Sequence, residues 1–131
     1  MAADAAAVAR AYLASFTAGE ADAIAAFVAA DFVNEHASAL GSGSVGRDEY
    51  RRRLPGFLDS FPGLRYEVGD VVADGSRAAV AYRLRATVDG HEIDLPGVML
   101  LAVDDDGSIT HRTDYWDSLT YLRQTGQALV E

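Results

Sequence analysis

The feature that most restricts the fold of this chain is a series of four strand-like segments in its second half. Apolar and polar side chains alternate there with a period of two, which indicates strands with two unlike faces. The segments are 64–73, 77–88, 91–103 and 109–116. Each short connection between them contains Asp-Gly, a pair that favours tight hairpin turns. We therefore predict an antiparallel meander of four strands.

The first half of the chain has helical periodicity instead. Asp4 can cap a helix that runs to about Thr17, where Gly19 follows as a stop signal. A second short helix and a brief strand over 31–36 come next. The small and glycine-containing segment 37–45 then predicts a loop or a flexible flap.

A third helical stripe lies between this loop and the first strand of the meander. Its apolar residues, from Tyr50 to Phe61, recur every three or four positions. Pro55 and Gly56 interrupt the stripe, and an internal proline removes a hydrogen bond and crowds the preceding turn. We therefore expect a kink or two short helices here.

Helices followed by a long meander predict an α+β domain, with the helices packed on one face of a curved antiparallel sheet. Such a sheet leaves a conical space between the layers, and we expect the ligand site in that cavity. No repeat, linker or low-complexity segment interrupts the sequence, so we expect one domain over residues 1–131.

Composition excludes several classes of function. The formal charge of −9 argues against binding to nucleic acid or to anionic membrane surfaces. The absence of cysteine excludes thiol chemistry and disulfides, and His36, His91 and His111 lack the spacing of metal ligands. The run of three aspartates at 104–106 lacks the spaced ligands of a calcium loop and predicts a turn. No leader or membrane-length apolar run is present, so we expect a cytoplasmic protein. We also expect that it needs no cofactor.

Segment 77–88 has two faces that can be oriented in either of two ways. One face is apolar and mainly aliphatic, and it includes Val80, Tyr82 and Leu84. The other face combines small residues with Arg83 and Arg85. The arginine face can line the cavity while the aliphatic face forms a homodimer interface. Alternatively, the arginines face solvent and the aliphatic residues form the core. The sequence alone leaves both arrangements open.

Asp114 is an acidic residue in the middle of the last strand, on the same face as Arg112 and Trp116. Because charges are rarely buried without a partner, Asp114 is either exposed to solvent or buried because it has a functional role. No serine lies in a nucleophile elbow, so the remaining chemistry is acid–base catalysis by a carboxylate. Asp117 has the position of a helix N-cap, which explains it fully, although a catalytic role is the alternative.

The layout of helices, short strand, helix and meander resembles the nuclear transport factor 2-like superfamily over essentially the whole chain. The closing segment 117–126 looks like the end of SnoaL-like polyketide cyclases, in which Asp-x-Leu-Gly-Leu-Leu-x-Gln-Leu-Gly is typical. Segments 113–117 and 95–99 look like limonene epoxide hydrolase. The resemblance implies a cone-shaped small-molecule site, and the superfamily contains enzymes, binders and dimerisation modules alike.

Residue by residue, the resemblance to the hydrolase places Asp114 on its catalytic base and Arg83 on the arginine that lies between its two catalytic aspartates. Arg85 stands where the hydrolase has its second, acidic aspartate, and an arginine cannot supply that proton. Asn34 and His36 fall on its water-holding pair. Epoxide hydrolysis of the usual kind is therefore disfavoured.

Relatives of the cyclase and ketosteroid isomerase type use a single aspartate in an apolar cone, and this pattern gives the leading hypothesis. In it, Asp114 is the base, paired with Arg83, and His36, Asn34 or Arg85 stabilises an oxyanion. The alternatives are that Asp114 and Arg83 form a structural pair, and that His36 is a loop-edge residue.

The predicted function is proton transfer, as a cyclisation or isomerisation, on a small hydrophobic carbonyl, polyketide or terpenoid compound. Epoxide hydration and non-catalytic ligand binding or dimerisation are the alternatives. We expect a homodimer through the outer face of the sheet. The predicted apolar walls of the pocket are Leu13, Phe16, Phe57, Phe61, Ile93, Leu95, Trp116 and Tyr121.

Overall fold

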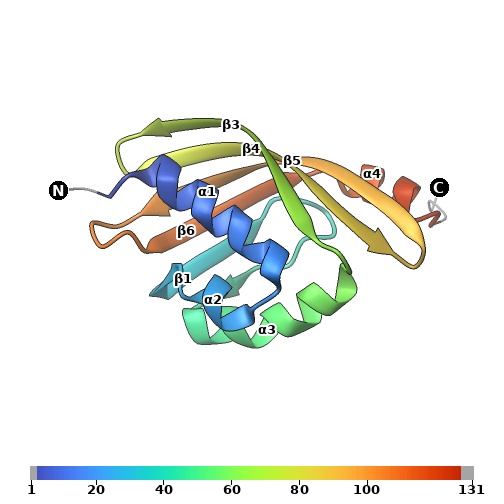
Figure 1. The fold of residues 1–131 in the computed structure, drawn as a ribbon, viewed down its shortest axis with the longest axis horizontal. Helices are drawn as coiled ribbons and strands as arrows, with labels where there is room; N and C mark the ends of the chain where they lie inside the picture. The colour runs from blue at the N-terminus through green and yellow to red at the C-terminus, as the bar shows by residue number, and fades with distance from the viewer. Residues whose placement is uncertain (1–2, 128–131) are drawn as a thin grey trace.

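The computed structural model describes residues 3–127 and contains a layer of helices packed on a curved six-stranded sheet (Figure 1). The elements are α1 (Ala5–Ser15), a 3-10 turn (Phe16–Ala18), α2 (Ala21–Ala25), β1 (Val28–His36), β2 (Ser44–Val45), α3 (Arg47–Ser60), β3 (Arg65–Asp74), β4 (Arg77–Val88), β5 (His91–Val103), β6 (Ile109–Trp116) and α4 (Ser118–Gln124). The predicted α+β architecture, with helices packed on one face of a curved sheet, is confirmed.

The sheet has the order β2-β1-β6-β5-β4-β3, in which the four strands of the predicted meander are antiparallel neighbours. The hairpin between β4 and β5 turns through Asp89 and Gly90, both of which have positive φ. Strand β1 adds to the meander by pairing in parallel with β6. This pairing places His36 opposite Asp114, so residues far apart in sequence meet on neighbouring strands.

The predicted helix caps are confirmed. Asp4 accepts a hydrogen bond from the backbone N–H of Ala7 at 3.2 Å, and Asp117 accepts one from Leu119 at 3.0 Å. The first strand is longer than predicted, because it begins at Val28 and not at residue 31.

The alternative of two short helices around Pro55 is wrong, because α3 is one continuous α-helix, whereas a kink at Pro55 stays a prediction. Pro55 and Gly56 both lie on its exposed side. The carbonyl oxygen of Arg51, which loses its intrahelical donor at the proline, can therefore be hydrated. The helix buries Tyr50 and Leu54 on the opposite side.

The face of β4 that turns inward is the aliphatic one. Val80, Tyr82 and Leu84 are buried, whereas Arg83 and Arg85 lie on the outer face of the sheet and pair there with carboxylates. The second of the two arrangements is therefore the observed one. The homodimer through the outer face stays a prediction.

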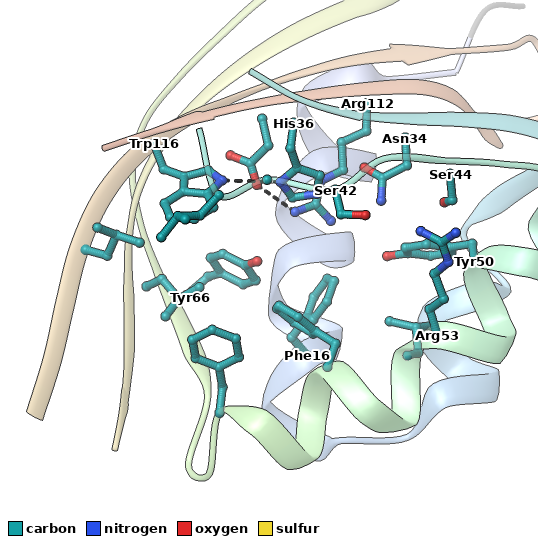
Figure 2. A pocket seen from close by; sticks show the side chains of 18 of the residues that line it. Phe16, Asn34, His36, Ser42, Ser44, Tyr50, Arg53, Tyr66, Arg112 and Trp116 are labelled. Atoms are coloured by element: carbon teal, nitrogen blue, oxygen red, sulfur yellow. Dashed lines mark hydrogen bonds and ion pairs between the residues drawn. The ribbon is translucent and has the colours of Figure 1, made fainter. Parts of the chain in front are cut away.

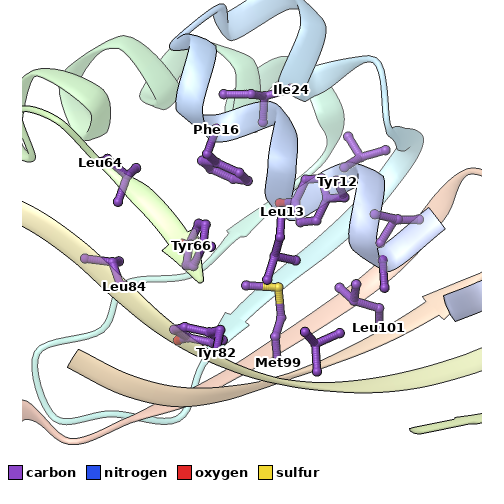
Figure 3. Packing of buried hydrophobic residues seen from close by; sticks show 14 of the residues in the cluster. Tyr12, Leu13, Phe16, Ile24, Leu64, Tyr66, Tyr82, Leu84, Met99 and Leu101 are labelled. Atoms are coloured by element: carbon purple, nitrogen blue, oxygen red, sulfur yellow. The ribbon is translucent and has the colours of Figure 1, made fainter. Parts of the chain in front are cut away.

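The hydrophobic core lies between α1 and the concave face of the sheet (Figure 3). Tyr12, Leu13 and Phe16 reach down from the first helical segment towards Met99 and Leu101 of β5. Tightly packed apolar side chains of this kind hold the two layers together. They also fix the depth of the space that remains between α3 and the sheet.

Candidate active site

A cavity of about 360 Å³ opens between the helices and the concave face of the sheet (Figure 2). Most of the side chains in its walls are aromatic or aliphatic. Of the predicted site residues, it contains Phe16, Asn34, His36, Phe57, Phe61, Leu95, Asp114, Trp116 and Tyr121.

Four predicted site residues do not line the cavity. Leu13 and Ile93 are almost fully buried in the core, where neighbouring side chains separate them from the space. Arg83 and Arg85 are on the opposite face of the sheet, because the period of two in β4 sends the aliphatic side chains inward. These four assignments are corrected by the structure.

Asp114 lies in the wall of the cavity with only 3% of its surface exposed. Its Oδ1 accepts a hydrogen bond from the Tyr82 hydroxyl at 2.5 Å, and its Oδ2 accepts one from Nη2 of Arg112 at 2.7 Å. Two donors, one of them charged, therefore hold both oxygens of the carboxyl group in place. Asp114 is the only carboxylate in the cavity wall among residues 3–127.

The arginine that pairs with Asp114 is Arg112. The resemblance had implied Arg83 instead. Arg112 is two residues earlier on β6, so both side chains point to the same face of the strand. The second guanidinium nitrogen, Nη1, donates to the hydroxyl of Tyr12 at 2.8 Å, and this hydroxyl is hydrogen-bonded to that of Tyr50. Burial opposes the charge of Arg112, but the surrounding tyrosine oxygens and Asp114 outweigh it and raise its pKa well above the usual value.

Tyr82 reaches Asp114 because the residue opposite it on β5 is Gly97. A Cβ atom at position 97 would lie 2.3 Å from the Tyr82 hydroxyl oxygen and 2.4 Å from its Cζ atom. The ring can therefore cross β5 to Asp114 on β6 only because Gly97 has no side chain. Burial, followed by the charge of Asp114, raises the pKa of Tyr82, so its hydroxyl remains a donor.

Sequence reasoning missed Tyr82, which it treated as one member of an aliphatic face. The available signals were a tyrosine within that face and a glycine in the middle of the facing strand. A glycine inside a strand often marks a close approach by another group. The reach across β5 depends on the strand register, which places Tyr82 opposite Gly97.

His36 is a neutral hydrogen-bond donor in the cavity wall. The indole N–H of Trp116 donates to Nδ1 of His36 at 3.2 Å. An indole nitrogen can only donate, so Nδ1 is the acceptor and the ring proton resides on Nε2. Burial and the charge of Arg112 lower the pKa of His36, which Asp114 opposes more weakly.

The predicted loop over 37–45 is shorter in the structure, because residues 44–45 form strand β2, and its residues Leu40, Gly41 and Ser42 contribute to the cavity wall. The Ser38 hydroxyl binds the backbone of Trp116, and the N–H of Leu40 donates to the Ser118 hydroxyl at 3.0 Å. These contacts join the loop to the strand that carries Asp114.

Within residues 3–127, no cluster of three or more histidine and carboxylate side chains forms a metal site. Over the same residues, no helix has the length and apolar character needed to cross a bilayer.

Residues 9–112 match the SnoaL-like domain family. The chain belongs to this family. The match covers most of the chain and stops two residues before Asp114, so it supports the domain assignment and is independent of this carboxylate. None of the curated proteins compared with the chain matches it.

Solved structures share the fold of this SnoaL-like domain. A protein of ketosteroid isomerase-like fold from Catenulispora acidiphila, in complex with trimethylamine, superposes with a TM-score of 0.84 at 19% identity, covering 92% of this chain and 93% of that one. The epoxide hydrolase/cyclase-like enzyme SalBIII gives 0.73 at 19% identity, covering 83% and 87%. A candidate polyketide cyclase from Xanthomonas campestris gives 0.73 at 27% identity, covering 92% and 95%.

Proposed function

We propose that this SnoaL-like domain is an enzyme that transfers a proton at a carbon next to the carbonyl group of a small hydrophobic substrate. The solved structures that it resembles include a candidate polyketide cyclase and a protein of ketosteroid isomerase-like fold, which supports a reaction of this class. The observation that carries the proposal is the position of Asp114. It is a single, doubly anchored carboxylate in the wall of a cavity whose lining is mostly apolar.

In the proposed reaction, an Asp114 oxygen removes a proton from the α-carbon of the substrate. The electrons of the broken C–H bond move to the carbonyl oxygen, and the resulting enolate accepts a hydrogen bond from Nε2–H of His36. Each carboxylate oxygen has a further lone pair beyond those used by Tyr82 and Arg112. When the substrate is a β,γ-unsaturated ketone, the enolate is a dienolate, and Asp114 returns the proton to its γ-carbon, which gives the conjugated isomer.

Tyr82 and Arg112 act as positioning residues. A carboxylate held at both oxygens cannot rotate away from the substrate, and little reorganisation remains for the transition state. An ion pair of this kind seldom stabilises a protein more than apolar side chains of the same size would. Its presence in the cavity wall therefore favours a functional role over a structural one.

The resemblance to epoxide hydrolases carries less weight. The hydrolase pattern requires a second carboxylic acid, and Arg85, which stands at that place in the sequence, is on the outer face of the sheet. The cavity wall, as far as residues 3–127 form it, offers one carboxylate. We therefore place epoxide hydration second.

A substrate panel separates these functions. Purified protein is incubated with β,γ-unsaturated ketones, whose conversion to conjugated enones is followed by ultraviolet absorbance, and with terpene epoxides, whose diols are followed by gas chromatography. We expect isomerisation by the wild type and by Asp117→Asn, an exposed acid outside the cavity, but not by Asp114→Asn. Diol formation without isomerisation would favour the epoxide hydrolase. Tight binding of ketones without any product would identify a binding module.

A further inference from the structure

Two neutral polar side chains that line the cavity have unsatisfied hydrogen-bonding atoms. Asn34 is 8% exposed, and its Oδ1 is buried without a partner. The hydroxyl oxygen of Ser44 is also buried without a partner. Both residues line the cavity, and in Figure 2 they lie on the side of His36 opposite to Trp116.

Asn34 and Ser44 are adjacent because they form a cross-strand pair between β1 and β2. Directly opposed residues of this type have Cβ atoms about 4.5–5.5 Å apart, so one bound group can reach both side chains. Buried polar groups in folded proteins almost always have partners, because leaving one unmade weakens the fold. A pair of unsatisfied groups in a cavity wall therefore indicates a ligand.

The chemistry of this pair matches a hydroxyl group better than an anion. A hydroxyl both donates and accepts, so it can donate to Oδ1 of Asn34 and accept from the freely rotating Ser44 hydroxyl. A carboxylate can only accept and would leave Oδ1 unsatisfied. The guanidinium of Arg53, which also lines the cavity, is partly occupied, since Nη1 donates to the Gly43 carbonyl at 2.7 Å and Nε lies 3.5 Å from a Glu49 carboxylate oxygen.

We propose that Asn34 and Ser44 form a subsite that binds a hydroxyl group of the substrate, remote from the reacting carbonyl. Asn34 and His36 are two residues apart on β1, which separates the subsite from the oxyanion donor by about 7 Å along the strand. This inference rests on the proposed function and narrows it to a hydroxylated hydrophobic carbonyl compound, whose two polar ends are held by different parts of the cavity.

The test measures binding and requires no turnover. Acetophenone and its para-hydroxy, para-methoxy and para-carboxy derivatives are titrated into the protein, and binding is followed by chemical shifts of the cavity residues. Wild type is compared with Asn34→Leu, which has similar volume without polar atoms, and with Ser44→Ala. We expect the para-hydroxy compound to bind wild type about tenfold more tightly than acetophenone.

The variants should lose this preference while they keep their affinity for acetophenone. Equal affinities of wild type for acetophenone and its hydroxy derivative would overturn the proposal, as would a preference that persists in both variants or an absence of binding. Tightest binding of the carboxy derivative would show that the subsite is built for an anion, and equally tight binding of the methoxy derivative would show that Oδ1 receives no donor.

A second measurement needs no ligand. Because Oδ1 of Asn34 accepts no hydrogen bond within residues 3–127, Asn34→Leu should leave the melting temperature unchanged or raise it. A marked fall would assign Asn34 a structural role and overturn the proposal. If the hydroxyl preference is found but no ketone is ever isomerised, the subsite stands and the proposed reaction fails.

Discussion

The buried ion pair between Arg112 and Asp114 gives a sharp prediction about stability. Both side chains are 4% exposed and their charged atoms are 2.7 Å apart. Replacing either partner alone, as Arg112→Met or Asp114→Leu, leaves the other charge buried without a counter-ion. Such changes cost about 3–5 kcal/mol. At about 3–4 °C per kcal/mol for 131 residues, each single variant should melt roughly 10–20 °C below wild type.

Replacing the whole polar group should restore most of this loss. The double variant Arg112→Met, Asp114→Leu still leaves the Tyr82 hydroxyl without its acceptor, which costs about 1–3 kcal/mol. Adding Tyr82→Phe removes that donor, whereas Tyr12 and Tyr50 continue to satisfy each other. The triple variant should therefore be as stable as wild type or more stable, while having no activity.

The assay is equilibrium unfolding in urea, with thermal melts as a second measure, on wild type, both single variants, the double and the triple. Activity is followed on the ketone panel. If each single variant loses less than about 1 kcal/mol of unfolding free energy, the ion pair is not buried as described. A triple variant that is as unstable as the single variants would show that the ion pair stabilises the fold. Its burial would then no longer favour a functional role for Asp114.

Three further predictions follow from neighbouring contacts. Gly97→Ala should displace the Tyr82 ring and therefore lose both stability and activity, as Tyr82→Phe does. The expected loss of unfolding free energy, measured in urea, is about 1.5–3 kcal/mol. A Gly97→Ala variant equal to wild type would contradict the close approach at Gly97. His36 has a folded-state pKa below 6.5, so the unfolded chain binds its proton first as pH falls. The free energy of unfolding should therefore fall below pH 6.5 by up to about 1.4 kcal/mol per pH unit. Urea unfolding at several pH values measures this slope, and His36→Gln should remove the part that His36 contributes. Identical slopes for wild type and His36→Gln would contradict this prediction. Asp117→Ala removes only a helix cap, so it should lower the melting temperature slightly and leave turnover unchanged, whereas lost turnover would make Asp117 the functional carboxylate.

Much of the fold could be predicted because its signals are local. The alternation in residues 64–116, the Asp-Gly turns, and the caps at Asp4 and Asp117 each depend on a few neighbouring residues. The continuity of α3 through Pro55 could not be predicted in this way. It depends on whether the proline faces water or the core, which only the packing of the helix decides.

The site could be predicted in part for the same reason. Asp114 shares a strand face with Arg112, and this pairing was visible in the spacing of the two residues. The choice of Arg83 instead followed from the resemblance and from an open question about which face of β4 turns inward. That question is decided by the helices that cover the sheet, and the contact between Tyr82 and Asp114 depends on the register that sets Tyr82 opposite Gly97.

The most direct test of the central claim is the exchange of α-hydrogens of a hydrophobic ketone with deuterium from solvent, measured by nuclear magnetic resonance. Exchange reports the proton transfer itself, whichever product the enzyme forms afterwards. We predict exchange catalysed by wild type and by Asp117→Asn, and a rate about 10²–10⁴-fold lower for folded Asp114→Asn. Equal exchange rates for wild type and Asp114→Asn would contradict the assignment of Asp114 as the catalytic base.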